Sequence, residues 1–287
     1  MFNSLKMPFL RDVFGRNKGF YKSNRLALEP VKASSYGKVY LIGAGSGDAE
    51  LLTLKAYRTL QHADIIMVDW LVDSAIYEYF PACAQRIFVG KKCGRHSMTQ
   101  AEICSLMVQQ ALLGKTVVRL KGGDPSIFGR IAEETLMLRQ HDIPFAIIPG
   151  VTAASGCAAY AGIPLTHRDC AHAVRFVTAH KQDPQAEINW QELAKTDDTL
   201  VFYMGLNRIT HITEQLQLHG MPGSTPIAVV DQGTLIQQRI CCKTLDSLTA
   251  QTDLVTFNGP ALIIVGEVVN KREPVELGLL SFDMALT

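Results

Sequence analysis

The stretch VVRLKGGDPSIFGR, residues 117–130, joins a short apolar run to a loop that contains two glycines, an acid and a proline. The run VVRLK predicts a buried strand, because it is short and rich in β-branched residues. Gly122 and Gly123 permit backbone conformations that let a ligand approach the main chain. Asp124 before Pro125 is also typical of a helix cap, so the loop alone leaves a structural and a ligand-binding interpretation open.

Nine further short apolar runs recur along the chain, and several of them end in glycine or aspartate. They lie at residues 39–45, 63–69, 86–90, 143–150, 174–180, 199–205, 225–233, 239–245 and 260–269. Helical spacing of apolar residues marks three other segments, at residues 51–61, 100–113 and 133–141. Strands that alternate with helices need crossover connections, so the sequence predicts an α/β protein with mostly parallel sheets.

The strand pattern starts again after residue 167, which predicts two α/β domains, at residues 37–150 and 151–272. Residues 1–36 differ from both, because they carry seven lysines and arginines against two acids and show no sustained apolar period. We expect a basic, flexible extension there, with a targeting or interaction arm as the alternative. A tail at residues 273–287 completes the predicted organisation.

The charge balance argues against a dedicated nucleic-acid binder, which usually carries a clear basic excess. Lysine and arginine total 28, aspartate and glutamate total 27, and the formal net charge is +1. The seven cysteines form no C-x-x-C pair, which favours reduced thiols in a cytoplasmic protein over a disulfide framework or a zinc site. We therefore expect no nucleic-acid partner and no metal.

An uncharged stretch at residues 143–166 invites a membrane interpretation, but its composition argues against one. It contains three prolines and consists mostly of alanine, glycine, serine and threonine, so it is too weakly apolar to span a bilayer. No signal-peptide pattern opens the chain either. These features predict a protein without a membrane partner.

The segment GAGSGD, residues 43–48, nearly matches the dinucleotide-binding pattern G-x-G-x-x-G. Its third glycine, Gly47, comes one residue early, although Asp69 ends the next strand about where a ribose-binding acid is expected. The near match argues weakly for a nicotinamide enzyme and more simply for a tight turn from strand to helix. In open α/β sheets, ligands bind beyond the carboxyl ends of the strands, where the glycines of this chain gather.

From residue 38 to residue 270, the chain resembles the uroporphyrinogen-III C-methyltransferases, which are class III tetrapyrrole methylases. The most specific motifs are VYLIGAGSGD, LLTLKA, VGKKCGRHS, VVRLKGGDPSIFGR, IPGVTAASGCAAYAGIPLTHRD, VFYMG and PALIIVGEVV. The resemblance implies a homodimer of two-domain α/β subunits that uses S-adenosylmethionine as methyl donor. It also implies methylation of uroporphyrinogen III at C2 and C7, which gives precorrin-2 for sirohaem, cobalamin or haem d1.

The same resemblance assigns site residues by motif. The implied cofactor-binding residues are Ser46, Gly122, Gly123, Asp124, Ile127, Thr152, Ala153, Met204 and Gly233. The implied catalytic residues are Asp69 as proton acceptor, Lys91 as proton donor and Arg130 as a further candidate. The implied substrate-binding residues are Arg130, Glu133 and Arg168, with His96 as a weaker candidate, whereas Lys121 receives no role. The i,i+3 spacing of Arg130 and Glu133 predicts an ion pair between them.

Two residues depart from the family pattern, since Ser46 stands where the family usually has proline and Trp70 where it usually has arginine. An arginine at position 70 would meet a substrate carboxylate, whereas an indole has one donor and no charge. Either Arg95 takes over that contact or Trp70 stacks on a pyrrole ring. Two alternatives stay open: a methylase of the same superfamily with another substrate, and a catalytically weak protein that binds a tetrapyrrole.

Overall fold

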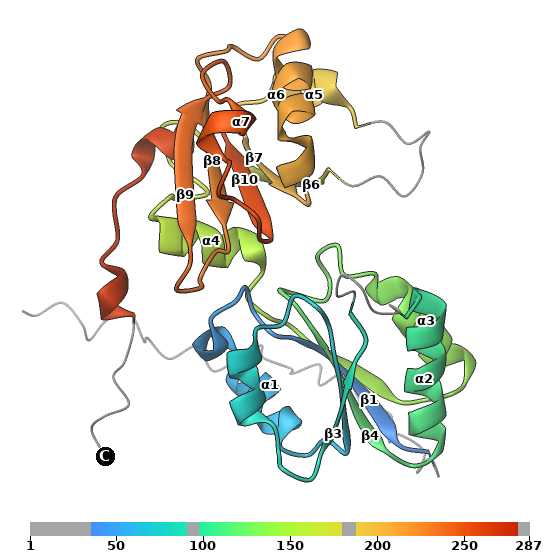
Figure 1. Ribbon diagram of the computed structural model, residues 1–287. Helices are drawn as coiled ribbons and strands as arrows, with labels where there is room; N and C mark the ends of the chain where they lie inside the picture. The colour runs from blue at the N-terminus through green and yellow to red at the C-terminus, as the bar shows by residue number, and fades with distance from the viewer. Residues whose placement is uncertain (1–35, 91–97, 180–187, 281–287) are drawn as a thin grey trace, which may run out of the picture. The chain divides into compact units, whose positions relative to one another are not determined.

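Ten strands form two five-stranded sheets in the computed structural model, which describes residues 36–90, 98–179 and 188–280 (Figure 1). All of these residues fall within one compact unit. The strands of the first sheet are β1 Lys38–Gly43, β2 Ile65–Val68, β3 Gln85–Phe88, β4 Thr116–Lys121 and β5 Phe145–Ile148. Those of the second are β6 Val174–Thr178, β7 Thr199–Tyr203, β8 Pro226–Asp231, β9 Arg239–Thr244 and β10 Ala261–Val265. Each strand coincides with one of the ten predicted runs, although β1, β3 and β4 begin one residue earlier.

The helices account for the segments with helical spacing. The α-helices are α1 Leu54–Leu60, α2 Gln100–Leu112, α3 Ile131–Gln140, α4 Ala153–Ala161, α5 Trp190–Ala194, α6 Ile209–Leu218 and α7 Ala250–Asp253. Short 3₁₀ helices are η1 Ala49–Leu51, η2 Ser74–Tyr79, η3 Leu206–Arg208, η4 Glu267–Lys271 and η5 Leu277–Leu279. Among the residues that the structure describes, no helix has the length and apolar content needed to cross a membrane.

The first sheet is entirely parallel, with the strand order β3-β2-β4-β1-β5. Successive side chains of a strand point to opposite faces, so each strand feeds two cores. On β1, Ile42 packs in the core that contains Ala56 of α1, and Leu41 packs in the core that contains Met107 of α2 and Leu138 of α3. Parallel strands place their carboxyl ends at one edge of the sheet, where the predicted glycine-rich loops therefore gather.

The second sheet has the order β6-β7-β10-β8-β9 and is mixed. Only β6 and β7 are parallel, whereas β10 runs antiparallel to β7 and β8, and β9 runs antiparallel to β8. The α/β fold class is confirmed, but in this sheet the expected parallel pairing is restricted to one strand pair. The physical reason is connection length, because the short link at residues 232–238 returns β9 beside β8, whereas a parallel neighbour needs a longer crossover.

Helices cover both faces of the second sheet as well. Leu200 and Phe202 of β7 pack with residues of α5 and α6, whereas Val201 of the same strand packs with Ala154 and Ala158 of α4. The helix that follows the first sheet in sequence therefore belongs to the core of the second. A domain boundary near residue 150 is compatible with this packing and stays a prediction.

Candidate functional site

A cavity of about 1010 Å³ lies at the carboxyl ends of the strands of the first sheet. The residues after each of the five strands contribute to its wall: Gly45 and Ser46 after β1, Asp69 and Leu71 after β2, Val89 and Gly90 after β3, Gly122, Gly123 and Asp124 after β4, and Thr152 and Ala153 after β5. Residues of α2 and α3 also line it, as do Arg119 and Lys121 of β4, the segment at residues 127–130, and Tyr203, Met204 and Pro260. Its volume suits a ligand at the upper end of the usual range for binding pockets.

Four glycines bring the loops after β1, β4 and β5 into close contact. A Cβ atom added to Gly43 would lie 2.5 Å from the carbonyl oxygen of Gly123 and 2.6 Å from the amide nitrogen of Gly150. Gly123 also donates its N–H to the carbonyl of Gly45, with a nitrogen–oxygen distance of 2.6 Å. Because a side chain at Gly43 or Gly150 would collide with backbone, these glycines are needed to hold the loops together.

Asp124 joins the loop after β4 to the end of β5. Its Oδ1 accepts from the Ser126 amide at 2.7 Å, and its Oδ2 accepts from the Gly150 amide at 3.0 Å. The helix-cap interpretation does not hold, because the next helix, α3, starts only at Ile131. Asp124 therefore shapes the loop, and each carboxylate oxygen keeps a lone pair for a further donor.

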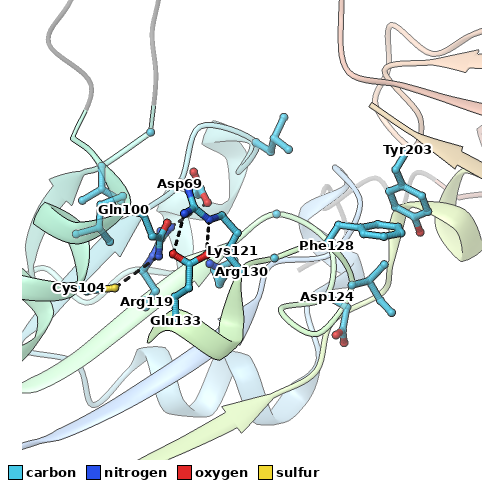
Figure 2. A pocket seen from close by; sticks show the side chains of 18 of the residues that line it. Asp69, Gln100, Cys104, Arg119, Lys121, Asp124, Phe128, Arg130, Glu133 and Tyr203 are labelled. Atoms are coloured by element: carbon cyan, nitrogen blue, oxygen red, sulfur yellow. Dashed lines mark hydrogen bonds and ion pairs between the residues drawn. The ribbon is translucent and has the colours of Figure 1, made fainter. Parts of the chain in front are cut away.

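Strained backbone gathers around the cavity. Phe128, Arg130 and Met204 all line it and adopt left-handed φ angles of 52°, 55° and 56°. Each such residue costs of order 1–3 kcal/mol, and strain of this kind concentrates at functional sites. The rings of Phe128 and Tyr203 pack against each other at a tilt of 60°, with their centroids 5.0 Å apart (Figure 2).

Tyr203 ties the start of α4 to β7. Its hydroxyl lies 2.7 Å from Oγ1 of Thr152 and accepts from the Ala154 amide at 3.1 Å. Burial raises the pKa of the Tyr203 phenol, so this group stays protonated near neutral pH. The phenol thus fixes Thr152, one of the predicted cofactor residues, by hydrogen bonds at the edge of the cavity.

Charged side chains gather at the other end of the cavity, where Asp69, Arg119, Lys121, Arg130 and Glu133 lie near one another (Figure 2). Arg130 and Glu133 form the predicted i,i+3 pair, with Nε to Oε1 at 2.8 Å and Nη2 to Oε2 at 2.7 Å. This two-point hydrogen bonding raises the pKa of Arg130 and lowers the pKa of Glu133. Both side chains are about half exposed, so the pair is open to a ligand in the cavity.

The structure brings most of the predicted site residues together. Eight of the nine predicted cofactor residues line the cavity: Ser46, Gly122, Gly123, Asp124, Ile127, Thr152, Ala153 and Met204. Among the predicted catalytic and substrate residues, Asp69, Arg130 and Glu133 also line it. Lys91, Arg95 and His96 lie outside the described residues.

Two predicted site residues have other surroundings. A Cβ atom added to Gly233 would lie 2.2 Å from Sγ of Cys157, so this glycine packs against α4. Arg168 lines a separate, open hollow together with Thr166, His167 and Asp169. The geometry of the cavity therefore gives these two residues no part in its lining.

Several residues that line the cavity were not predicted as site residues, among them two aromatic residues and two cations: Phe128, Tyr203, Arg119 and Lys121. Tyr203 directly precedes Met204, and both cations stand in the stretch quoted first. A charge inside an apolar strand is costly unless it is paired, so the position of Arg119 in the sequence already predicts buried acidic partners.

The cavity fits a nucleoside cofactor bound largely through main-chain groups. Ser46 lines the cavity, but its Oγ is buried against Gly156 of α4 and has no hydrogen-bond partner among the described residues, so its main chain is the part open to a ligand. Beside Gly123, a left-handed residue, an added Cβ would approach no atom closer than 3.8 Å, which leaves room at the loop surface. Within the described residues, no group of three or more metal-binding side chains is placed to hold a metal ion.

We predict that Cys157 is unreactive in the folded protein. Burial raises the pKa of its thiol to about 12, so only about one thiol in 10,000 is ionised at pH 8. Iodoacetamide at pH 8, followed by peptide mass spectrometry, should label the exposed Cys83 and leave Cys157 unlabelled until denaturant is added. Labelling of both thiols at the same rate would contradict the close packing of Cys157 against Gly233.

Comparison with known proteins gives consistent matches. Residues 38–249 match the family model of Tetrapyrrole (Corrin/Porphyrin) Methylases. A siroheme synthase of Pseudomonas aeruginosa is 51% identical over 237 residues, which are 83% of this chain and 51% of that protein. Siroheme synthase 2 of Yersinia enterocolitica is 51% identical over 241 residues, 84% of this chain and 50% of that protein. The chain thus spans about half the length of the curated relatives that it matches.

Solved structures match over 95–100% of their length. The native uroporphyrin III C-methyl transferase of Thermus thermophilus has a TM-score of 0.70 and 37% identity, covering 82% of this chain and 100% of that one. The Thermus thermophilus enzyme complexed with S-adenyl homocysteine has a TM-score of 0.69 and 36% identity, with the same coverage of both chains. A cobalt precorrin-4 methyltransferase reaches a TM-score of 0.72 at 29% identity, covering 81% of this chain and 95% of that one.

Proposed function

The chain belongs to the tetrapyrrole methylase family, and on that basis we propose that it methylates uroporphyrinogen III at C2 and C7 to give precorrin-2. The observation that carries the proposal is the cavity at the strand ends, which joins a glycine-rich loop to a cluster of charged side chains. The higher sequence identity to uroporphyrin III C-methyl transferase, 37% against 29% for the cobalt precorrin-4 methyltransferase, supports this substrate over a later precorrin.

S-adenosylmethionine is the proposed methyl donor, and its sulfonium supplies an electrophilic methyl group when it is bound. The loop at residues 122–124, Ile127, the Thr152–Ala153 pair and Met204 would hold it, with Ser46 as a further main-chain contact. Main-chain groups dominate this set, because the glycines leave amides and carbonyls open to a ligand. Gly233 is proposed to contribute by allowing close packing of its loop against Cys157.

Recognition of the substrate requires groups that bind carboxylates, since uroporphyrinogen III carries eight of them. Arginine suits this task, because its planar guanidinium donates two parallel hydrogen bonds to a carboxylate. Arg130 is the proposed contact inside the cavity, held in place by Glu133, and Arg168 is proposed as a more distant contact. Arg119 and Lys121 are buried and paired with acids, whereas Arg130, although paired with Glu133, is about half exposed, which makes it the more available cation.

Methylation of a pyrrole carbon leaves a proton to be removed from the ring system, and Asp69 is the proposed acceptor. It is one-third exposed, lines the cavity and directly follows β2, where its amide donates to the carbonyl of Leu120 at 3.0 Å. Lys91 is proposed as the proton donor. General acid–base catalysis by a positioned group contributes about 10²- to 10⁴-fold to a rate, which sets the scale for loss of Asp69.

Transfer of a labelled methyl group to uroporphyrinogen III tests the proposal directly. We expect incorporation of two methyl groups per tetrapyrrole, identified by mass as precorrin-2. Binding of the tetrapyrrole without transfer would favour a carrier, whereas transfer to a later precorrin alone would keep the family and change the substrate. We also propose a cytoplasmic homodimer, and light scattering during gel filtration tests the oligomeric state.

We predict that Trp70→Arg lowers the Michaelis constant for uroporphyrinogen III. Trp70 is half-exposed and directly follows Asp69, to whose Oδ1 its amide donates at 2.9 Å; it does not line the cavity, so the expected gain comes from a flexible arginine that reaches a substrate carboxylate from this position. A new charge-assisted contact is worth about 1.5–3 kcal/mol, enough to lower the constant several-fold. Methyl transfer is measured at varied substrate concentration.

The matched control is Trp70→Leu, which removes the indole without adding a charge. A lower Michaelis constant in Trp70→Arg alone indicates a new carboxylate contact. If both variants raise it, the indole itself binds the substrate, and the prediction is wrong.

A further inference from the structure

Two carboxylates and two cations form a continuous set of ion pairs at the charged end of the cavity, and we call these residues the ion chain. Arg119 donates from Nη2 to Asp69 Oδ2 at 3.0 Å and from Nε to Glu134 Oε1 at 3.2 Å. Lys121 donates from Nζ to the same Glu134 oxygen at 2.9 Å. Gln100 of α2 adds a fourth contact, from Nε2 to Glu134 Oε1 at 3.1 Å.

The ion chain is an expensive way to fill the core. Arg119 is 2% exposed, Lys121 is 4% exposed and Glu134 is fully buried. Taking such ions out of water costs several kcal/mol each, and apolar residues of similar size often stabilise a fold better. Glu134 Oε2 is also buried without a hydrogen-bond partner among the described residues. Stability alone therefore does not explain why β4 carries Arg119 between two buried aliphatic residues.

Asp69 is the member of the ion chain that reaches the cavity, and both of its oxygens are held. Oδ1 accepts from the Trp70 amide at 2.9 Å, and Oδ2 accepts from Arg119. Arg119 in turn is fixed through all three side-chain nitrogens, because Nη1 donates to the carbonyl of Leu120 at 3.3 Å. The carboxylate thus has one orientation, set from the interior of the sheet.

We propose that Arg119 is the positioning residue for Asp69, and that Glu134 is the anchor that fixes Arg119. This inference rests on the proposed function, in which Asp69 accepts the proton. The guanidinium fork suits the task, since it makes two contacts in fixed geometry that a lysine ammonium cannot reproduce. The two cations, Arg119 and Lys121, match the two carboxylates, Asp69 and Glu134, in number, so the four groups are neutral as a set.

The state of Lys121 supports this arrangement. Burial lowers the pKa of its ammonium, with the nearby Arg119 guanidinium acting in the same direction and Glu134 opposing both. Loss of the anchor's charge would leave two buried cations beside one another. Glu134 is therefore needed to keep both cations in place, although it does not line the cavity.

The variant that tests the positioning role is Arg119→Lys, which keeps the charge of the ion chain and removes the fork. We expect kcat to fall about tenfold or more, because a small misplacement of a catalytic group can cost up to 100-fold. The affinity for S-adenosylhomocysteine, measured by calorimetry, should stay within about twofold, since the glycine-rich loop is untouched. The Michaelis constant for the tetrapyrrole should change little.

A double-mutant cycle with Asp69→Asn separates positioning from a merely structural role. If Arg119 acts through Asp69, then Arg119→Lys should reduce the residual kcat of Asp69→Asn by less than about threefold. The matched control is Arg175→Lys, because Arg175 also bridges two acids, Asp198 and Glu192, but on β6 and away from the cavity. It should leave kcat within about twofold.

Glu134→Gln provides a second variant that keeps the shape and the accepting oxygen of the anchor. It should lower kcat in the same direction, and its effect should not add to that of Arg119→Lys. An equal fold-loss from Arg119→Lys in the parent and in Asp69→Asn overturns the proposal. So does a crystal structure of Arg119→Lys in which the Asp69 carboxylate is unmoved. The crystal structure tests whether Arg119 positions Asp69 even if the unaltered chain transfers no methyl group. Absence of methyl transfer would count against the proposed function and not against this inference.

Discussion

Replacement of Gly150 by alanine should remove most of the affinity for S-adenosylmethionine and lower the melting temperature. The added Cβ would lie 2.4 Å from the carbonyl oxygen of Gly123 and within 2.9 Å of backbone atoms of Gly43. Because every neighbour is main chain, no side chain can rotate away, and the loops after β1, β4 and β5 must separate. Overpacking of this kind costs about 1–3 kcal/mol, which corresponds to roughly 2–12 °C.

Displacement of these loops also disrupts the site for the methyl donor, so we expect affinity to fall by about 100-fold, the scale of a small geometric error in a preorganised site. Isothermal calorimetry with S-adenosylhomocysteine and a thermal melt measure the two effects. Gly278→Ala is the matched control, because a Cβ there would meet no atom of the described residues within 4 Å. Affinity and melting temperature close to those of the unaltered chain would show that the loops are more adaptable than their contacts imply.

The positions of the strands were predictable because local sequence determines them. Each run is short, β-branched and bounded by turn residues, and burial on both faces of a sheet removes the need for alternation. Strand pairing was less predictable, because it depends on contacts distant in sequence. Nothing in the run at residues 260–269 indicates that β10 lies between β7 and β8, antiparallel to both.

Some parts of the candidate site were likewise predictable from local sequence, whereas others were not. Glycines and Asp124 were identifiable because strand ends that bind ligands need backbone freedom and an exposed polar group. The partners of Arg119 were not, since Asp69 lies 50 positions before it and Glu134 15 positions after it. The left-handed backbone of Phe128 and Met204 was equally hidden, because neither residue type favours that conformation and tertiary contacts impose it.

Loss of the Asp124 carboxylate should weaken binding of S-adenosylhomocysteine by about 1.5–3 kcal/mol, or roughly 10- to 100-fold. Two effects combine in Asp124→Ala: the loop loses its bonds from Ser126 and Gly150, and the ligand loses an acceptor beside the glycines. Asp124→Asn separates them, because an amide keeps one accepting oxygen but places an NH₂ group opposite either Ser126 or Gly150. We expect this variant to bind with intermediate affinity.

The matched control for Asp124 is Asp73→Ala. Asp73 Oδ1 accepts from the Ala75 amide at 2.9 Å, so it closes a similar local turn at the start of η2, and it does not line the cavity. Asp73→Ala should leave the affinity for S-adenosylhomocysteine within about twofold of that of the unaltered chain. It should lower the free energy of unfolding about as much as Asp124→Ala does, by an amount on the order of 1 kcal/mol. If Asp124→Ala behaves like Asp73→Ala, then Asp124 serves only to shape its loop. A loss of affinity in Asp124→Ala alone indicates that this carboxylate faces the ligand, as expected for an acid that sits beside exposed main chain at the end of a parallel strand.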